Sequence, residues 1–430
     1  MEKLDALLYE LGLHPDCIPL PAAAAAFQAE MVRGLAGTGG SLDMVPTWLA
    51  AAPPPRESGA VLALDCGGTR FRRALVRFSD GSPVLSDYLE APMPGAGGGA
   101  ALPAGAFWDA LGQMVRPLAR PGMPIGFCFS YPMSILPDHD GVLLRLTKEL
   151  RLPELVGRRL APGLLSRLPA GCGPAVLLND TAASLLGGVT AIREAAGSGA
   201  AGMILGTGFN CCYAARGVEL RKCPNAPDMI VNLECGNYAQ PQGLLDRELD
   251  AGTDDPGRGT LEKMLSGAYH AHLVYLAAGH CARAGLFTPA GARALEAGPV
   301  FRAEALEDFV QGRGPWWEAL TEPADRETLL GILRHSNARA ARLVAMVLTA
   351  LLRQTGAGTD AAHPFCVVAD GSAFYRSTLF RAALGRELGE VLPALGRHIR
   401  FLKSPGGNLP GAAAAALQAA GEGAVEKPSV

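Results

Sequence analysis

Two short stretches of this chain share a pattern that strongly constrains its fold. In residues 61–69 and again in residues 202–208, an apolar run long enough for a buried strand breaks into glycines and a threonine. Such a break lets the backbone approach a ligand closely and direct its N–H groups, with a threonine hydroxyl, at phosphate oxygens. One loop of this kind is often only a tight turn. Two of them, in different halves of the chain, predict a nucleotide held from both sides.

The composition permits this arrangement and excludes other classes. At 430 residues, with 49% hydrophobic and 18% charged residues, the chain can bury large cores and form two domains. A net charge of −3 without a basic stripe argues against nucleic acid as a partner. The N-terminus lacks the basic and apolar regions of a signal peptide, and no apolar run reaches membrane length. We therefore expect a soluble cytoplasmic protein with no membrane contact.

The cysteine pattern agrees with a reducing compartment. Ten cysteines are scattered along the chain without a C-x-x-C motif. Three of them, Cys66, Cys128 and Cys366, lie inside apolar strand-like runs, where a free thiol packs as a small hydrophobic group. We expect reduced thiols in the core.

The first fifty residues are predicted to be helical. Leucines near the N-terminus follow helical spacing, and the apolar face of Phe27, Met31 and Leu35 runs into the glycines of residues 37–40. The prolines at 53–55 cannot continue a helix, so we expect a new domain to begin just after them.

The following segment alternates strands with a helix. A helix is expected over 107–118, and Asp80-Gly81 predicts a hairpin turn between two of the strands. The strand-like runs are 61–66, 71–78, 84–90, 124–129 and 174–178.

From residue 202 the same order of elements begins again. A long helix is expected from residue 261 and another around residue 343, and an alanine-rich helix from residue 411. The strand-like runs are 202–206, 210–215, 229–234 and 366–370. This repetition predicts two similarly wound α/β halves.

Asp180 lies at a strand-to-helix junction, directly after the apolar run 174–178. In open α/β sheets, ligands collect outside the carboxyl ends of strands. Asp180 is therefore a candidate for the base that orients and deprotonates an acceptor hydroxyl in phosphoryl transfer, while Asp65 is positioned for a phosphate-bound Mg²⁺. The alternative for Asp180 is a helix N-cap, because aspartate is favoured before an apolar helical run.

An ordered set of segments resembles the hexokinase family. Residues 42–48 (LDMVPTW) are similar to the "LKMLPT" segment of that family, and residues 255–267 resemble its "NPG…EKMISG" helix entry. Each motif is weak alone, whereas the ordered set is specific and extends from about residue 27 to residue 418. The other segments are 27–35, 65–69, 129–132, 146–148, 178–181, 206–208 and 232–234.

The resemblance implies an α/β, two-domain actin-like (ribonuclease H-like) sugar kinase fold with a cleft between a small and a large domain. N-terminal helices within 1–59 would pack on the large domain, residues 179–410. The small domain would comprise residues 60–178, completed by the C-terminal helix at about 411–430. Sugar binding would rotate the domains and expel water, about linkers near 59–61, 178–182 and 410–412.

The resemblance also implies an enzyme that transfers the γ-phosphate of ATP, with Mg²⁺, to the 6-hydroxyl of a hexose. Glucose is the first expectation, with mannose and fructose as further substrates. Asp180 would be the general base, and Lys148 would neutralise charge on the transferred phosphate. The implied sugar contacts are Ser130, Thr147, Lys148, Asn179, Asp180, Asn210, Glu234 and Glu262.

The nucleotide side is implied in the same way. Asp65 would act on Mg²⁺ through water, because this ion keeps much of its hydration. The implied positions are Asp65, Gly67, Gly68, Thr69, Arg70, Gly206, Thr207 and Gly208, with Asp370, Gly371 and Ser372 on the adenosine side.

Several of these residues have simpler explanations. Glu234 and Glu262 could be surface carboxylates, although the apolar run before Glu234 favours a function. Lys148 could belong to a solvated face and Asp370 to a simple turn.

The chain also departs from the family pattern. Arg70 stands where the family has asparagine, so a guanidinium beside the first loop would bind phosphate or crowd it. Residues 234–238 read ECGNY where the family has EWGAF. Gly259 replaces a glutamine three residues before Glu262, and residues 404–411 replace a G-S-G-x-G run.

Two other functions stay open. A catalytically weak sugar sensor is motivated by Arg70 and Gly259, and it would bind glucose without phosphorylating it. An actin- or chaperone-like ATPase shares the two phosphate loops. That second alternative is disfavoured because it leaves no role for Thr147, Lys148, Asn179, Asp180, Glu234 and Glu262.

Overall fold

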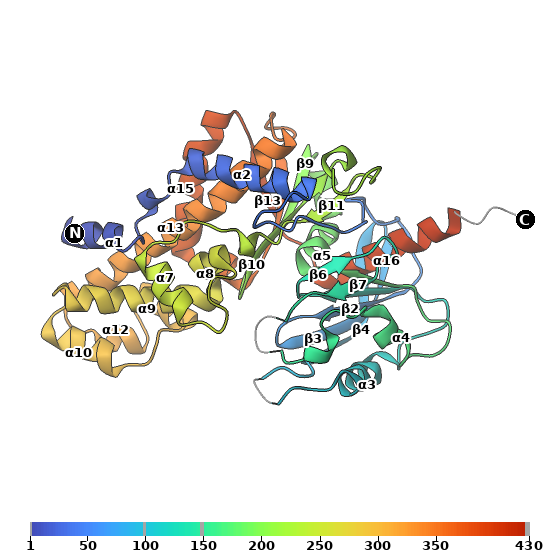
Figure 1. Ribbon diagram of the computed structural model, residues 1–430, viewed down its shortest axis with the longest axis horizontal. Helices are drawn as coiled ribbons and strands as arrows, with labels where there is room; N and C mark the ends of the chain where they lie inside the picture. The colour runs from blue at the N-terminus through green and yellow to red at the C-terminus, as the bar shows by residue number, and fades with distance from the viewer. Residues whose placement is uncertain (1, 98–99, 147–149, 426–430) are drawn as a thin grey trace, which may run out of the picture.

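The computed structural model describes residues 2–97, 100–146 and 150–425, and its framework is two mixed sheets (Figure 1). The first sheet has the order β4-β3-β2-β5-β8. Strands β2, β5 and β8 run parallel to one another and are buried along their whole length, as parallel strands covered on both faces must be. The strands are β2 (Val61–Cys66), β3 (Arg70–Ser79), β4 (Ser82–Pro92), β5 (Ile125–Phe129) and β8 (Ala175–Leu178).

The second sheet has the order β1-β11-β10-β9-β12-β13. From β11 to β13 it repeats the first sheet, with three antiparallel strands followed by two parallel ones. This repeat confirms the prediction of two similarly wound halves. The strands are β1 (Val45–Pro46), β9 (Gly199–Leu205), β10 (Phe209–Ala215), β11 (Met229–Asn232), β12 (Phe365–Asp370) and β13 (Ile399–Leu402).

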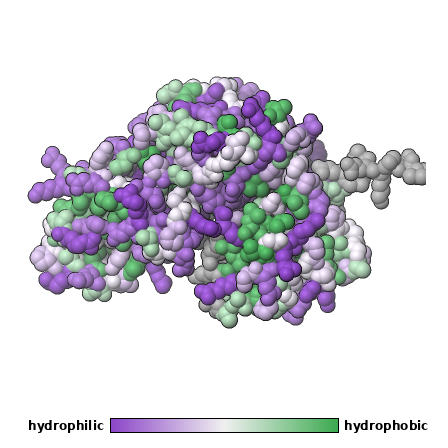
Figure 2. Space-filling model, viewed as in Figure 1, coloured by the Kyte–Doolittle hydropathy of each residue, from purple (hydrophilic) through white to green (hydrophobic). Residues whose placement is uncertain are grey.

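Two helices form the layer between the sheets. Helix α5 (Asp180–Gly187) packs on the second sheet and α16 (Asn408–Val425) on the first, and the two helices pack on each other. Small residues allow this approach, since a Cβ on Gly126 would collide with the backbone of Ala412. Figure 2 shows a mostly hydrophilic surface, indented between the two halves, with an apolar area over the first half.

The outer faces carry the remaining helices. The first sheet is covered by α3 (Ala104–Val115) and α4 (Ala161–Leu165), and the second by α2 (Leu20–Ala36), α13 (Pro323–Thr355) and α15 (Thr378–Leu395). A separate apolar core joins α13 to α1 (Glu2–Glu10), α7 (Leu244–Ala251), α9 (Gly267–Arg283), α10 (Pro289–Ala297), α11 (Ala303–Val310) and α12 (Pro315–Ala319). The shorter elements are α6 (Val189–Glu194), α8 (Thr260–Leu265), α14 (Ser372–Arg376), β6 (Met133–Ile135), β7 (Gly141–Leu143), η1 (Pro15–Cys17), η2 (Pro153–Leu155), η3 (Gly217–Glu219) and η4 (Cys235–Asn237).

Two helix predictions were wrong in part. Helix α2 ends at Ala36, where Gly37 adopts a left-handed φ of 70°, and the chain from there to β1 is irregular rather than helical. The helix expected from residue 261 is broken at Ser266. It breaks because the N–H groups of Gly267 and Ala268 donate to carbonyls of the loop at 206–207, at 2.8 and 3.2 Å.

The predicted hairpin and thiols are confirmed. Asp80 and Gly81 both have positive φ, 50° and 76°, as a two-residue hairpin turn requires. All ten cysteines are free, and Cys66, Cys128 and Cys366 are fully buried. Among the helices in the described part of the chain, none is long and apolar enough to span a bilayer.

Candidate active site

The first glycine loop connects β2 to β3 and follows a buried carboxylate. Asp65 is 3% exposed, and its two oxygens accept hydrogen bonds from Arg72 and from Asn408 of α16, each at 3.2 Å. Burial raises the pKa of Asp65, and these two partners, with the Cys128 thiol, oppose that rise. Asp65 is therefore a carboxylate held in a fixed position beside the loop.

Arg72 and Asn408 were not among the predicted site residues. Arg72 lies directly across the β2–β3 ladder from Asp65, a register that the predicted turn at Asp80-Gly81 does not set, because that turn joins β3 to β4. Asn408 is 343 positions from Asp65 in the sequence, and no local pattern announces that contact.

Arg70 points to solvent rather than toward Asp65. Its side chain is 55% exposed, and its Nε lies 3.7 Å from Glu90, which also accepts from Arg72 Nε at 3.0 Å. The carbonyl of Arg70 accepts from the Gly67 N–H at 3.0 Å and so closes the loop. In this structure the Arg70 side chain lies near Glu90, and its backbone carbonyl is part of the loop closure.

The second glycine loop joins β9 to β10 and packs on the turn after β12. A Cβ on Gly371, whose φ is 107°, would collide with the carbonyl of Leu205 and lie 2.7 Å from Gly206 N. The structure thus brings the predicted residues 206–208 and 370–372 together. Asp370 accepts from the Gly371 N–H at 2.7 Å, which gives it the turn role that was its simpler explanation.

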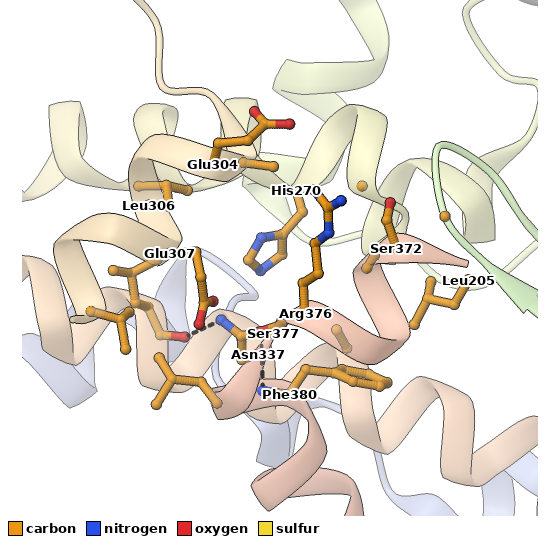
Figure 3. Close-up of a pocket in the computed structure, with 18 of the residues that line it drawn as sticks. Leu205, His270, Glu304, Leu306, Glu307, Asn337, Ser372, Arg376, Ser377 and Phe380 are labelled. Carbon is orange, nitrogen blue, oxygen red and sulfur yellow. Dashed lines mark hydrogen bonds between the residues drawn. The ribbon is translucent and has the colours of Figure 1, made fainter. Parts of the chain in front are cut away.

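A pocket of about 370 Å³ opens beside this second loop. Gly206, Thr207 and Ser372 are among the residues that line it, and helices α9, α11, α13, α14 and α15 contribute most of the others. Figure 3 shows Leu205 and Ser372 on one side of the pocket and Leu306 and Glu307 on the other. His270 points into its middle, and burial, with the charge of Arg339, lowers the pKa of this imidazole to about 4. Among the described residues, His270 Nε2 has no hydrogen-bond partner. His270 is therefore neutral at pH 7.

Asn179, not Asp180, caps helix α5. Its side-chain oxygen accepts from the N–H and the hydroxyl of Thr181, at 3.0 and 2.8 Å. Asp180 is the first helical residue and is partly exposed. The N-cap alternative for Asp180 is therefore wrong, and its carboxylate lies at the positive end of the helix dipole.

Asn232 links the residues around α5 to the second sheet. Its Oδ1 is within hydrogen-bond distance of the Thr181 hydroxyl and of Asn210 Nδ2, at 3.2 and 2.8 Å. Its Nδ2 donates to Glu234 Oε1 at 2.6 Å. These bonds join Asn179, Thr181, Asn232, Asn210 and Glu234 into one network.

Glu234 is the carboxylate of this network. It adopts a left-handed φ of 54° and is 9% exposed, so the surface alternative for it is wrong. Burial raises its pKa to about 7, Arg145 and Asn232 oppose the rise, and the charges of Asp43 and Asp180 add to it. Asp180 therefore acts electrostatically on Glu234. Asp65 and Asp180 both raise the pKa of the Cys128 thiol, which brings the two predicted aspartates into the same region.

Glu262 lies over the second loop, at the first turn of α8. Its Oε2 accepts from the Phe209 N–H at 2.9 Å, and a Cβ on Gly208 would lie 2.5 Å from that oxygen. Gly259, at the N-cap of α8, has a φ of 58° that suits glycine. The neighbouring Lys263 was not predicted. It is buried between Asp250 and Asp255 and anchors this turn.

Three predicted sugar contacts, Ser130, Thr147 and Lys148, belong to the first half of the sequence. Ser130 follows β5 and its N–H donates to Cys66 O at 3.1 Å, so it lies beside the first loop. Thr147 and Lys148 lie outside the described residues.

Comparison with known proteins gives consistent results along the chain. One family model, described as hexokinase, matches residues 200–418, just over half of the chain, and a second hexokinase model matches residues 14–189. Hexokinase-3 of Homo sapiens is 30% identical over 67% of this chain, but the match covers 32% of that protein. Hexokinase-1 of Oryza sativa subsp. japonica is 29% identical, over 92% of this chain and 87% of the rice protein. The chain thus spans about a third of the first curated relatives that it matches.

The fold is also similar to that of solved hexokinase structures. The structure of a hexokinase from Schistosoma mansoni complexed with glucose superimposes with a TM-score of 0.78 at 20% identity, covering 97% of this chain and 99% of that one. This match confirms the predicted two-domain α/β sugar kinase fold. The family models carry the assignment further: the chain belongs to the hexokinase family.

Proposed function

We propose that this protein transfers the γ-phosphate of ATP to the 6-hydroxyl of a hexose, with glucose as the first substrate to test. The observation that carries the proposal is the network of Asn179, Asn210, Asn232 and Glu234 beside Asp180. Amide and carboxylate oxygens accept hydrogen bonds from hydroxyls that lose water on binding, so this set suits a polyhydroxyl ligand. Family membership supports the same activity.

Asp180 would be the general base. Its place at the first residue of α5 favours the ionised carboxylate, which is the form that accepts a proton from the attacking hydroxyl. Thr147 and Lys148 would contact the sugar from the other half, with Lys148 also neutralising charge on the transferred phosphate. Ser130 and Glu262 would complete the sugar contacts.

The nucleotide would lie between the two glycine loops, with its nucleoside in the pocket next to Thr207 and Ser372. A neutral His270 inside this pocket can donate or accept a hydrogen bond without a charge. Both oxygens of Asp65 already have partners, Asn408 and Arg72, which fits a contact to Mg²⁺ through water rather than direct ligation. Bound Mg²⁺ would neutralise phosphate charge.

Closure of the two halves would exclude water from the reaction. The moving body would be residues 60–178 with the C-terminal helix, turning against residues 179–410, and α5 and α16 between the sheets are suited to transmit the motion. Ten free thiols agree with a reducing, cytoplasmic location.

The test is a coupled assay for hexose 6-phosphate with glucose, mannose, fructose and glucosamine. We expect Asp180→Asn to lose at least about 10²-fold in kcat, the usual scale for a lost general base. Its hexose affinity, measured by equilibrium dialysis, should change much less. Unchanged turnover in this variant would rule out Asp180 as the base. Hexose binding by the wild type without any ATP-dependent product would instead support the sugar-sensor alternative.

A further inference from the structure

One side-chain hydrogen bond joins the two halves of the molecule next to Glu234. Arg145, two residues after β7 in the first half, donates from Nη2 to Asn237 Oδ1 at 2.9 Å. Asn237 ends η4, the turn that begins directly after Glu234. The contact therefore connects the first half to the backbone segment that carries Glu234, the buried carboxyl whose pKa is raised to about 7.

The charges around Glu234 make this arginine important. Burial favours the neutral form of Glu234, and the negative charges of Asp43 and Asp180 add to this effect. Two amides contact it, Asn232 at 2.6 Å and Asn210 at 3.5 Å, and they carry no charge. Among the described residues, Arg145 is the cation whose charge opposes these effects, and it acts from the other half of the molecule.

We propose that Arg145 is a positioning residue for hexose binding: it holds the η4 turn through Asn237 and presents a positive charge to Glu234. This inference rests on the proposed function, since it assigns the hexose to the site that contains Glu234. An ionised Glu234 accepts hydrogen bonds from two hydroxyls, whereas the protonated acid has less acceptor capacity. Hexose affinity then depends on a residue that need not touch the sugar.

The two contributions of Arg145 can be separated by substitution. Asn237→Ala removes the acceptor and keeps the charge. Arg145→Lys keeps a positive charge and changes the planar donor geometry, whereas Arg145→Met removes both charge and donor and keeps an apolar stem of similar length. Arg158→Met is the matched control, because Arg158 is an exposed arginine of the same half that donates to the Glu154 carbonyl.

The experiment is calorimetric titration of each full-length variant with glucose, without nucleotide, from pH 5.5 to 9. We expect Arg145→Met to weaken glucose binding about tenfold at pH 7, because it loses both the charge and the hydrogen bond. Asn237→Ala and Arg145→Lys should weaken binding about threefold, because they disturb the hydrogen bond and keep the charge. Affinity of the wild type should fall below about pH 7, as Glu234 is protonated. Arg145→Met should move that midpoint upward, and Arg145→Lys and Asn237→Ala should leave it near the wild-type value.

Two results would overturn the inference. Wild-type affinity and an unshifted pH midpoint in Arg145→Met would show that Arg145 does not act on the site, while the proposed function would stand. Absence of glucose binding by the wild type would overturn the proposed function for this sugar, and the inference with it. A loss of affinity in Arg158→Met equal to that in Arg145→Met would also contradict the proposal. Circular dichroism and thermal unfolding of every variant identify misfolding. If the Arg145 variants misfold, Asn237→Ala still tests the hydrogen bond to the η4 turn, because it leaves Arg145 in place.

Discussion

The two glycine loops occupy equivalent places in two sheets of the same topology, yet they are stabilised differently. The loop after β2 lies among charged side chains, with Asp65, Arg72 and Glu90 bonded in series. The loop after β9 is packed by backbone against backbone, where Gly206 meets Gly371 and the carbonyl of Gly206 accepts from Gly267. We infer that the second loop depends mainly on shape and the first mainly on electrostatics. Substitutions that change shape or charge alone should therefore affect them differently.

The largest effect is expected for Gly371→Ala. A Cβ at this position meets the backbone of Leu205 and Gly206, and the φ of 107° disfavours any other residue. We expect a loss of about 3 kcal/mol or more in the free energy of unfolding, measured with urea. Gly385→Ala in α15 is the control, because a Cβ there meets nothing within 4 Å and alanine favours a helix. Equal stability of the two variants would contradict the packing of this loop by shape.

A change of comparable size in the free energy of unfolding is expected when the pH is raised, because Glu234 of the second half titrates. The pKa of this buried carboxyl is raised from 4.5 to about 7, so protonation favours the folded state. Its contribution to stability is fully present below pH 4.5 and is lost as the pH rises through about 7, at most about 3 kcal/mol. In Glu234→Gln, the free energy of unfolding should not fall in this way as the pH rises, because glutamine does not titrate. Urea unfolding of both proteins at pH 5 and pH 8 measures it, and the same pH dependence in both would show that other groups cause it.

The sequence predicted the strands and the loops well because these depend on local patterns. Apolar runs specified β2, β5, β8 and β12, and Asp80-Gly81 specified the hairpin. Contacts between distant segments were not predictable in this way. The break at Ser266 depends on carbonyls of the loop at 206–207, and the partners of Asp65 and Glu234 come from α16 and from the segment after β7. The segments of the site were therefore predicted, but not Arg72, Arg145 and Asp43, whose charges act on its carboxylates.

A smaller effect is expected for the pair Arg72 and Asp65 at the first loop. Arg72→Met leaves Asp65 buried with one cation fewer, but Arg72 is 39% exposed, so solvent screens part of the pair. We expect the free energy of unfolding to fall by about 1–2 kcal/mol at pH 7. The fall should be smaller at pH 4, because loss of Arg72 raises the pKa of Asp65 further than in the wild type, and Asp65 can then be protonated. In a double-mutant cycle, Asp65→Asn should remove most of the cost of Arg72→Met. Additive losses would show that the two side chains do not interact.

The smallest effect is expected for a substitution of Arg70. This substitution tests whether Arg70 contacts the nucleotide or only contributes to the charge around the first loop. Its side chain is more than half exposed and lies 3.7 Å from Glu90, so Arg70→Asn should change stability by less than about 0.5 kcal/mol. Because the residue borders the first loop, we expect a change of about twofold to fivefold in KM for ATP and none in KM for the hexose. Arg77→Asn, on the same strand and farther from the loop, is the control. An effect confined to the hexose would place Arg70 on the sugar side. An equal effect of Arg77→Asn on ATP would mean that the net charge of β3, rather than the position of Arg70, governs nucleotide binding.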